Sequence, residues 1–508
     1  MKSLIYTIGI LMLACSTFAQ DMTDALRYSN YKISGTARSQ AMGNAFGALG
    51  GDFTSLSINP AGAAVYRTGE FTFTTSVGNT KNDGNYLGKN SSDSEYTISI
   101  NNIGYVAAIP TGANSESGLV SLSFGMGFNR LASFAGSSIA EGSNMNNSLL
   151  SYFTNNMNAN YAGLSGNEDV ALNSGSYKYY EDLAWQTYLI NNDEQNKEYF
   201  NDISDNGYGQ SVRKTTQREG HINEYLMAFA ANFNHKFYIG GTLGIHDVYY
   251  KEDANIYEYD ANNNIPYFDE FNFGTTLSTS GYGFNFKVGA IYKPTTNLRL
   301  GLAFHTPTFY NLNDFYNSNM NSSVTYLSDG KTENYSAKPD EGGAYDYKIQ
   351  SPLKFILSGA YVIGKSGLIS VDYEILDYST ANINNGSDGY DFYDQNAEIV
   401  DAYRSVGNLH IGGEFRLDKN FSLRAGYENY QNAFNPSYLE NNGQTANKPV
   451  SIYSGGLGFK QGNLFMDVTY QRVSDQESIK LYPDLNANEM VQYDTNKNNV
   501  IFTLGYKF

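Results

Sequence analysis

The sequence has very little cysteine and no long apolar run in its main part. Cys15 is the only cysteine among 508 residues, so the chain cannot form an internal disulfide bond. Beyond residue 20 there is no stretch of about 18 apolar residues, the length that a membrane-spanning helix needs. These two absences exclude a disulfide scaffold and a helical membrane protein, and any crossing of a membrane has to use strands.

The first nineteen residues have the features of an export signal. Lys2 precedes an apolar stretch over 4–14, and the small residues Thr17 and Ala19 suit signal peptidase. The residues before Cys15 form a poor lipoprotein box, because leucine lies one position too far upstream. We therefore favour cleavage after Ala19 over lipidation and predict a signal peptide over residues 1–19.

Positive charge is scarce as well. The chain has 33 Lys and Arg residues against 51 Asp and Glu residues, which gives a net charge of -18 and a pI near 4.7. Nucleic-acid binding depends on Lys and Arg side chains that neutralise phosphates. The composition therefore excludes a nucleic-acid partner.

Motifs for catalysis, metal binding or cofactor binding are absent. The sequence has no GxSxG motif, no Walker loop and no dinucleotide fingerprint. Its five histidines are far apart and lack HExxH or chelate spacing, and for His305 we expect a position facing the lumen or at a strand end. We predict no catalytic residue, no metal site and no cofactor, and a protein that is not an enzyme.

Aromatic residues and glycine are abundant, with 44 Tyr, 30 Phe and 50 Gly. In the last segment, alternate positions from Val500 to Phe508 are apolar, and the positions between them are mostly polar or small. Such an alternating strand that ends on an aromatic residue is typical of the chains that the barrel-assembly machinery inserts. We therefore assign the assembly signal to Tyr506 and Phe508, with that machinery as a partner.

The same alternation recurs along the chain in about fourteen segments, and an even number is typical of bacterial single-chain barrels. Tight turns such as 418–420 and 461–463 alternate with long polar stretches, the largest of which are 132–220 and 305–347. Short periplasmic turns and long extracellular loops are the usual asymmetry of outer-membrane barrels. We predict an all-β fold, a 14-stranded antiparallel transmembrane β-barrel over residues 70–508 in the cell outer membrane. The segments lie near 70–79, 95–110, 117–131, 222–234, 236–258, 270–293, 297–306, 349–363, 366–381, 406–417, 420–430, 450–460, 463–473 and 495–508.

The stretch 132–220 is far longer than an ordinary connection, so it is expected to carry structure of its own. Residues 177–200 are expected to form short helices over the mouth of the barrel. We expect Trp185, the only tryptophan, to pack within this loop rather than contact a ligand.

Residues 20–69 do not have the pattern of a barrel strand. Small residues dominate this segment, and glycine permits the close backbone approach that folding in a confined space requires. Asn59-Pro60 is a turn signal. The positions that we single out are Gly43, Gly47, Gly50, Gly51, Asp52, Asn59, Pro60, Ala61 and Gly62.

This segment resembles the amino-terminal region of the FadL/TodX family of outer-membrane transport proteins, in particular its Bacteroidetes branch, members of which are sometimes labelled hemin receptors. The resemblance rests on the glycine-rich run 41–47, the acidic Asp52 and the Asn-Pro-Ala-Gly box at 59–62. It continues at 281–308, which is similar to the family's strand, turn and strand before a Ser/Thr-Pro pair.

The resemblance implies a lumenal hatch over residues 20–69 and passive uptake of hydrophobic small molecules, such as long-chain fatty acids or aromatic compounds. The ligand would leave sideways through a gap at a kinked strand, into a membrane that contains lipid and lipopolysaccharide. Gly125 and Gly127 are the candidates for that kink, and the ligand-binding residues stay unassigned because the longest loop lies elsewhere than in well-known members. The alternative is a PorV-like barrel that serves type IX secretion through protein interaction.

Overall fold

The computed structural model describes residues 20–508 except for 112–117, 162–178, 194, 327, 329, 387, 443, 445–447 and 483–489. The predicted signal peptide over 1–19 lies outside the described residues. Among the described residues, no helix has the length and apolarity to span a membrane.

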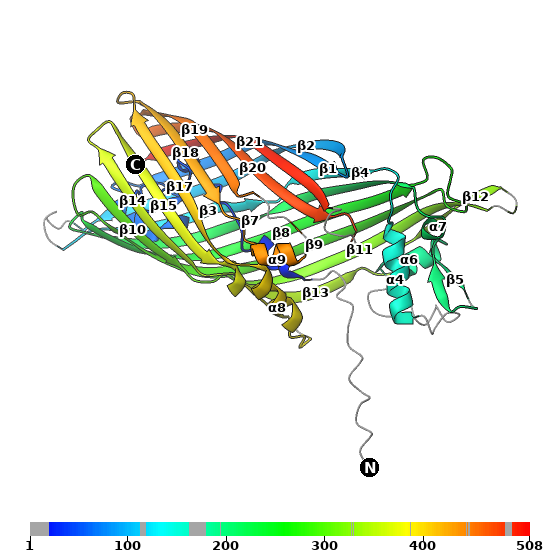
Figure 1. Ribbon diagram of the computed structural model, residues 1–508. Coiled ribbons are helices and arrows are strands. Elements are labelled where there is room, and N and C mark those ends of the chain that lie inside the picture. Colours follow the sequence, from blue (N-terminus) through cyan, green and yellow to red (C-terminus); the bar gives the residue numbers. More distant parts are fainter. Residues whose placement is uncertain are drawn as a thin grey trace, which may run out of the picture.

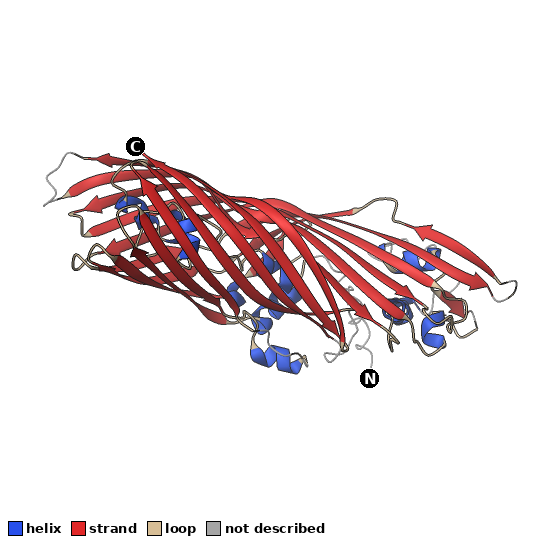
Figure 2. Cartoon of the chain, turned by 90° about the horizontal axis from the view of Figure 1, so that it is seen from above, coloured by secondary structure: helices blue, strands red, loops and turns tan. Residues whose placement is uncertain are grey.

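Antiparallel strands form one closed barrel (Figures 1 and 2). Each wall strand pairs with the next along the chain, and the last strand, β21, pairs with β1 and closes the wall. Two wall positions consist of two strands in succession: β10 and β11 both pair with β9, and β14 and β13 pair with β10 and β11. The wall therefore has fourteen strands, as predicted.

The wall strands are β1 (Glu70–Tyr86), β2 (Lys89–Pro110), β3 (Leu119–Ser133), β7 (Ser211–Phe233), β8 (Phe237–Tyr259), β9 (Glu270–Tyr292), β10 (Leu298–His305) with β11 (Phe309–Tyr326), β13 (Gly343–Gln350) with β14 (Lys354–Ile363), β15 (Gly367–Asp377), β17 (Ser405–Arg416), β18 (Phe421–Tyr430), β19 (Val450–Gln461), β20 (Leu464–Lys480) and β21 (Met490–Lys507).

The alternation in sequence separates the two faces of the wall. In β21, Phe502 and Leu504 are exposed, whereas Ile501 and Thr503 between them are buried. Outward apolar side chains at matching heights on neighbouring strands form a band around the barrel, which we call the apolar belt. This is the surface that a barrel presents to lipid.

The two ends of the barrel differ. Tight turns lie at the end that holds the C-terminus, and α4 (Leu149–Tyr161), α6 (Glu181–Gln186) and α7 (Asp202–Asp205) gather at the opposite end (Figure 1). The latter is the end of the long loops. One tight connection is found here too, because residues 87–88 join β1 directly to β2.

Both long loops contain more strand than we expected. The stretch 305–347 contains β11, most of β13, and β12 (Lys331–Ala337), while 132–220 contains β4 (Gly136–Gly142), β5 (Asn191–Asp193), β6 (Glu198–Phe200) and the first half of β7. The prediction of loops was wrong there because these strands rise beyond the apolar belt. Beyond the membrane the outer face of a strand contacts water. Its outward side chains therefore need not be apolar, and the alternation of apolar and polar residues is lost.

The expected helix within 177–200 is present as α6, among the described residues of that stretch. Trp185 packs edge-on against the ring of Tyr199, with 6.2 Å between ring centroids. Both belong to a hydrophobic cluster that joins the loop to β8, β9 and β11. The prediction that Trp185 packs within its loop is therefore confirmed.

Residues 20–66 form short helices inside the barrel: α1 (Met22–Arg27), α2 (Ala37–Ala41), α3 (Ser55–Ile58) and η1 (Pro60–Val65). Asp21 caps α1 and Thr36 caps α2, while Pro60 opens η1. Helix α2 contacts β18 to β21, whereas η1 contacts β3, β7, β8 and β9 on the other side of the wall. This lumenal segment therefore reaches across the barrel interior.

Three further elements lie above the lumenal segment between long-loop strands. They are η3 (Tyr378–Thr380) with β16 (Asn382–Asn385), α8 (Tyr393–Ala402) and α9 (Pro436–Asn441). Helix α8 contacts α1, η3 and α9. The start of the lumenal segment is thus covered from the loop side.

Candidate functional site

The Asn-Pro-Ala-Gly box of the lumenal segment lies against the wall at β9. Asn59 Nδ2 donates to the carbonyl oxygens of Gly47 (2.7 Å) and Ala290 (3.2 Å), and Asn59 Oδ1 accepts from Ala61 N at 3.1 Å. The Asn59 side chain is fully buried. One amide therefore links two parts of the lumenal segment to strand β9.

The glycines of the predicted motif permit close backbone contacts. Gly43 has φ +57° and Gly50 has φ +59°, a region that favours glycine. A Cβ on Gly50 would lie 2.7 Å from the Cα of Gly62, and one on Gly47 would lie 2.0 Å from Ser358 Oγ. The adjacent Gly51, with φ +67°, donates from its backbone N to Gly62 O at 3.1 Å.

Asp52 organises the helix start of α2. Its carboxylate accepts from Thr36 Oγ1 at 2.7 Å and from Thr54 N at 3.0 Å. Thr36 in turn caps α2 by accepting from Ser39 N. The acidic residue of the motif therefore has a structural role here, within the lumenal segment.

Glycines of the wall, which the sequence analysis did not single out, face the lumenal backbone. A Cβ on Gly289 would lie 1.9 Å from Asn59 Oδ1, one on Gly301 2.5 Å from Gly47 O, and one on Gly412 2.2 Å from Met42 O. Glycine inside a strand often marks such a close approach. The feature of the sequence that could have indicated these contacts is glycine at inward positions of β9, β10 and β17.

Three wall side chains bind three consecutive carbonyl oxygens at the end of α3. Thr242 Oγ1 donates to Leu56 O (3.0 Å), Lys287 Nζ to Ser57 O (3.1 Å) and His305 Nε2 to Ile58 O (2.8 Å). The last carbonyls of a helix have no partner within the helix. Strands β8, β9 and β10 supply these partners, and His305 faces the lumen as predicted.

Charged pairs surround these contacts. Lys287 also pairs with Glu224, and both side chains are buried. On the other side, Glu414 Oε2 accepts from Arg38 of α2 at 3.0 Å and from Arg424 of β18 at 2.8 Å. The interior wall is therefore polar and charged where the lumenal segment contacts it.

A small cavity remains between the lumenal segment and the wall. Its volume is about 30 Å³, and its lining combines apolar side chains such as Ile33, Ile58 and Ile356 with the ionisable ones of Lys287, Lys354, Asp372, Glu374 and His410. A space of this size holds water molecules, whereas drug-sized ligands need several hundred Å³. This cavity does not offer a passage for an apolar molecule.

The upper lumen, nearer the loops, is lined by aromatic side chains. Tyr28 of the segment after α1 has its ring 6.4 Å from those of Phe134 and Tyr310, and Arg27 lies over the ring of Tyr250. Burial raises the pKa of Asp24 in α1 to about 7, although the neighbouring Arg27 acts to lower it. The start of the lumenal segment thus lies among aromatic rings and also carries charge, since Arg27 pairs with Asp24.

The hydrogen-bonded wall is interrupted between β2 and β3. Their ladder ends at Asn102 and Asn129, and in the described part of the chain residues 89–101 of β2 pair with β1 alone. The continuation of β3, strand β4, pairs with β7 and lies against the β1–β2 hairpin, with Asn82 Nδ2 donating to Ser137 O at 2.5 Å. One edge of β2 is therefore unpaired.

Gly127 lies two residues before this interruption. It has φ +153°, and a Cβ there would lie 2.2 Å from Ile103 O. Just beyond the interruption, Arg130 O accepts from Ser34 N of the lumenal segment at 2.8 Å. The other candidate, Gly125, contacts Leu56 of the lumenal segment instead, where a Cβ would lie 2.4 Å from Leu56 Cδ2.

The interruption lies at the height of the apolar belt. Tyr96, Ile98 and Ile100 on the outer face of the unpaired edge are exposed by 78%, 81% and 45%. Val77 of β1 pairs with both Ile98 and Val500, which places this edge level with the upper belt residues of β21.

The residues predicted as the assembly signal, Tyr506 and Phe508, lie at the end of the wall that holds the C-terminus. Tyr506 is exposed on the outer face, and the ring of Phe508 stacks on Tyr105 of β2 with 5.7 Å between centroids. The backbone of Phe508 exchanges two hydrogen bonds with Gly69, both of 3.1 Å. The C-terminus therefore meets the point where the lumenal segment joins β1.

The chain matches the family model of the outer membrane protein transport proteins (OMPP1/FadL/TodX) over residues 13–508. It belongs to this family. As a family member with a closed fourteen-stranded barrel, it is a transport protein of the outer membrane. No curated protein sequence matches it significantly.

Several solved structures match this FadL/TodX family member over most of its length at low identity. A FadL homologue of Pseudomonas aeruginosa is 12% identical, with 94% of this chain and 98% of that chain covered and a TM-score of 0.54. The toluene transporter TodX of P. putida is 13% identical, with 94% and 99% covered and a TM-score of 0.49. The toluene transporter TbuX of Ralstonia pickettii is also 13% identical, with 94% and 99% covered and a TM-score of 0.48.

Proposed function

We propose that the protein is a channel for passive uptake of hydrophobic small molecules, in which residues 20–69 act as a hatch and the ligand leaves sideways through the wall. The observation that carries the proposal is the unpaired edge of β2 at 89–101, which lies at the height of the apolar belt. A pore that conducts solutes along the barrel axis does not need an unpaired edge, and unpaired backbone groups in contact with lipid are costly.

Straight passage to the periplasm is unfavourable for an apolar solute. It would have to pass the buried charges of Lys287, Glu224 and Glu414 and displace the glycine contacts of the hatch. An apolar molecule offers these charged groups no hydrogen bonds in return for the lost ones. The hatch and its polar surroundings therefore favour a route that avoids the lower lumen.

The sideways route keeps the ligand in apolar surroundings. A ligand enters from the loop end, displaces part of the aromatic packing around Tyr28 and Phe134, and moves past Ser34 and Arg130 to the unpaired edge. From there the outer face of β2, with Ile98 and Ile100, leads into the membrane. Gly127 acts as the kink that keeps β3 away from this edge.

The aromatic chamber suits either a fatty-acid chain or a small aromatic ring, because both bury apolar surface against aromatic side chains. Similar structures include transporters of toluene. We propose long-chain fatty acids or monoaromatic compounds as the substrate class.

The test is uptake of radiolabelled oleate and of toluene by Gram-negative cells that lack a transporter of their own and produce this protein. We expect uptake of at least one compound to rise about tenfold over cells with an empty vector. Uptake of neither compound would overturn the proposal. Co-purification with secretion components would then favour the PorV-like role.

A further inference from the structure

Gln20, the first described residue, is buried deep in the barrel although it opens the lumenal segment. Its side chain is only 4% exposed, and its Nε2 donates to Asp314 Oδ2 of β11 at 2.8 Å. Its backbone has φ +60°, which a residue other than glycine seldom adopts. The surroundings therefore fix the position of this residue closely.

Two buried carboxylates lie close to the Gln20 backbone. The amide of Asp21 donates to Asp24 Oδ2 at 3.2 Å, and successive residues are about 3.8 Å apart along the chain. The side chain of Gln20 reaches Asp314 directly. The backbone nitrogen of Gln20 is one residue before that of Asp21, so it lies within about 7 Å of Asp24 Oδ2, and the side chain of the same residue binds Asp314.

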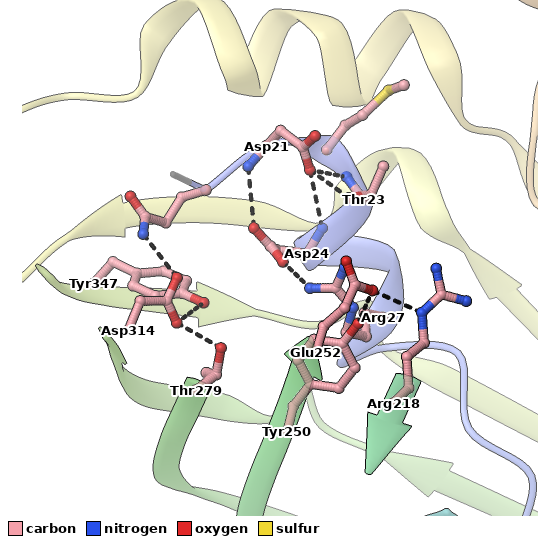
Figure 3. A network of polar contacts seen from close by, with 12 residues as sticks. Asp21, Thr23, Asp24, Arg27, Arg218, Tyr250, Glu252, Thr279, Asp314 and Tyr347 are labelled. Carbon is pink, nitrogen blue, oxygen red and sulfur yellow. Dashed lines mark hydrogen bonds and ion pairs between the residues drawn. The ribbon is translucent and has the colours of Figure 1, made fainter. Parts of the chain in front are cut away.

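This network contains fewer positively charged groups than negatively charged ones. The network drawn in Figure 3 contains the carboxylates of Asp21, Asp24, Glu252 and Asp314 and the guanidinium groups of Arg27 and Arg218. Arg27 pairs with Asp24, and Arg218 pairs with Glu252. Among the ion pairs of the described residues none includes Asp314, which accepts only from neutral donors: Thr279 Oγ1 at 2.6 Å, Tyr347 OH at 3.2 Å and Gln20.

We propose that the mature N-terminus is the missing cation: the α-ammonium group of Gln20 anchors α1 in the upper lumen through Asp24 and Asp314. The proposal rests on cleavage after Ala19. Signal peptidase hydrolyses the Ala19–Gln20 peptide bond with one water molecule, which leaves a carboxylate on Ala19 and an amine on Gln20 that takes up a proton. Before cleavage this nitrogen is an uncharged amide, so the anchor forms only in the processed chain.

The contact also protects the terminus chemically. A free N-terminal glutamine cyclises when its amine attacks its own side-chain amide and releases ammonia. Here the amide is held by Asp314, and the charged amine is not a nucleophile. We therefore expect Gln20 to stay uncyclised.

The experiment uses the purified mature protein in detergent and three variants. One inserts Gly-Ser between Ala19 and Gln20, which keeps every native side chain but moves the ammonium group away. The second is Asp314→Asn, and the control is Asp346→Asn, which removes an exposed carboxylate from the neighbouring strand β13. The measurements are intact mass, N-terminal sequencing, acetylation of the α-amine and hydrogen exchange of the amides in 22–28.

We expect the chain to begin with uncyclised Gln20, whose amine reacts with acetic anhydride only after unfolding. Exchange in 22–28 should be about tenfold faster in the insertion variant and in Asp314→Asn, and unchanged in Asp346→Asn. A terminus other than Gln20, loss of ammonia, or an amine that is acetylated in the folded protein would overturn the proposal. So would unchanged exchange in the insertion variant, which decides the question if Asp314→Asn does not fold.

Discussion

Single side chains of the wall hold the lumenal segment in place, and these contacts tolerate few substitutions. Lys287 binds both Ser57 O of α3 and the carboxylate of Glu224, and all of these groups are buried. A buried pair gains little net stability over an apolar pair, but a single unpaired charge in its place is very costly. The lumenal segment therefore depends on both members of the pair.

Lys287→Met is expected to lower the free energy of unfolding by about 3–5 kcal/mol, because Glu224 is left as a buried charge without its partner. The double variant Lys287→Met/Glu224→Leu should recover most of that loss. Urea unfolding in detergent measures both values. The matched control is Lys251→Met, which breaks the partly exposed pair with Asp253 and should cost far less, because solvent screens such a pair. Equal losses in Lys287→Met and Lys251→Met would contradict this account.

Gly289→Ala is expected to push the Asn59 side chain off the wall, because the added Cβ would lie 1.9 Å from Asn59 Oδ1. Overpacking of this kind costs about 1–3 kcal/mol. The change should loosen the lumenal segment and speed cleavage within 20–66 by a protease added to the purified protein. Gly359→Ala on β14 is the control, since nothing lies within 4 Å of its added Cβ. Similar cleavage rates for both variants would show that Gly289 has no such role.

At the scale of elements, the sequence predicted those strands whose two faces meet lipid and lumen. In segments such as 499–508 apolar residues recur at every second position, because one face of β21 lies in the apolar belt. Strand β11 was missed, since its sequence NLNDFYNSNMNSS lacks that alternation beyond the membrane. The Asn59–Gly62 box was found, but Gly289, which packs against Asn59, and Lys287, which binds the neighbouring Ser57 O, were not. Those contacts depend on how distant strands align around the barrel, which no local pattern encodes.

The contact between α4 and α6 in the long loop should weaken as the pH rises. Burial raises the pKa of Glu181 from 4.5 to about 7, against the effect of the hydrogen bond from Asn156. The folded loop therefore holds this proton more tightly than the unfolded loop does. The stabilisation is complete below pH 4.5 and is lost as the pH rises through about 7.

Trp185 lies on α6 and is the only tryptophan, so its fluorescence reports on this loop. The urea midpoint of the fluorescence change should fall between pH 5 and pH 8 in the wild type. Glu181→Gln should remove most of this dependence, whereas Glu198→Gln, at an exposed position in the same loop, should leave it unchanged. A wild-type midpoint that does not change with pH would refute the assignment to Glu181.

At the scale of the whole molecule, three features have to be explained together. The barrel closes between β1 and β21, the lumenal segment fills its interior, and one edge of β2 is unpaired. The lumenal segment contacts strands on opposite sides of the barrel, and among the described residues the ladder between β2 and β3 ends at Asn102 and Asn129, which leaves one edge of β2 unpaired over 89–101. A barrel with a filled lumen and no interruption in its wall would offer a solute no path. The interruption between β2 and β3 therefore gives the barrel its only proposed exit, and it opens toward lipid rather than toward the periplasm.

The most direct test places a large side chain in this exit. Ser99 lies on the inner face of the unpaired edge, whereas Ser94 on the same strand faces outward. Uptake of radiolabelled oleate or toluene, whichever the wild type carries, is measured in cells that produce Ser99→Trp or the control Ser94→Trp at equal levels in the outer membrane. Lateral exit predicts that uptake falls about tenfold in Ser99→Trp and stays at the wild-type rate in Ser94→Trp. Wild-type uptake by Ser99→Trp would contradict the sideways route.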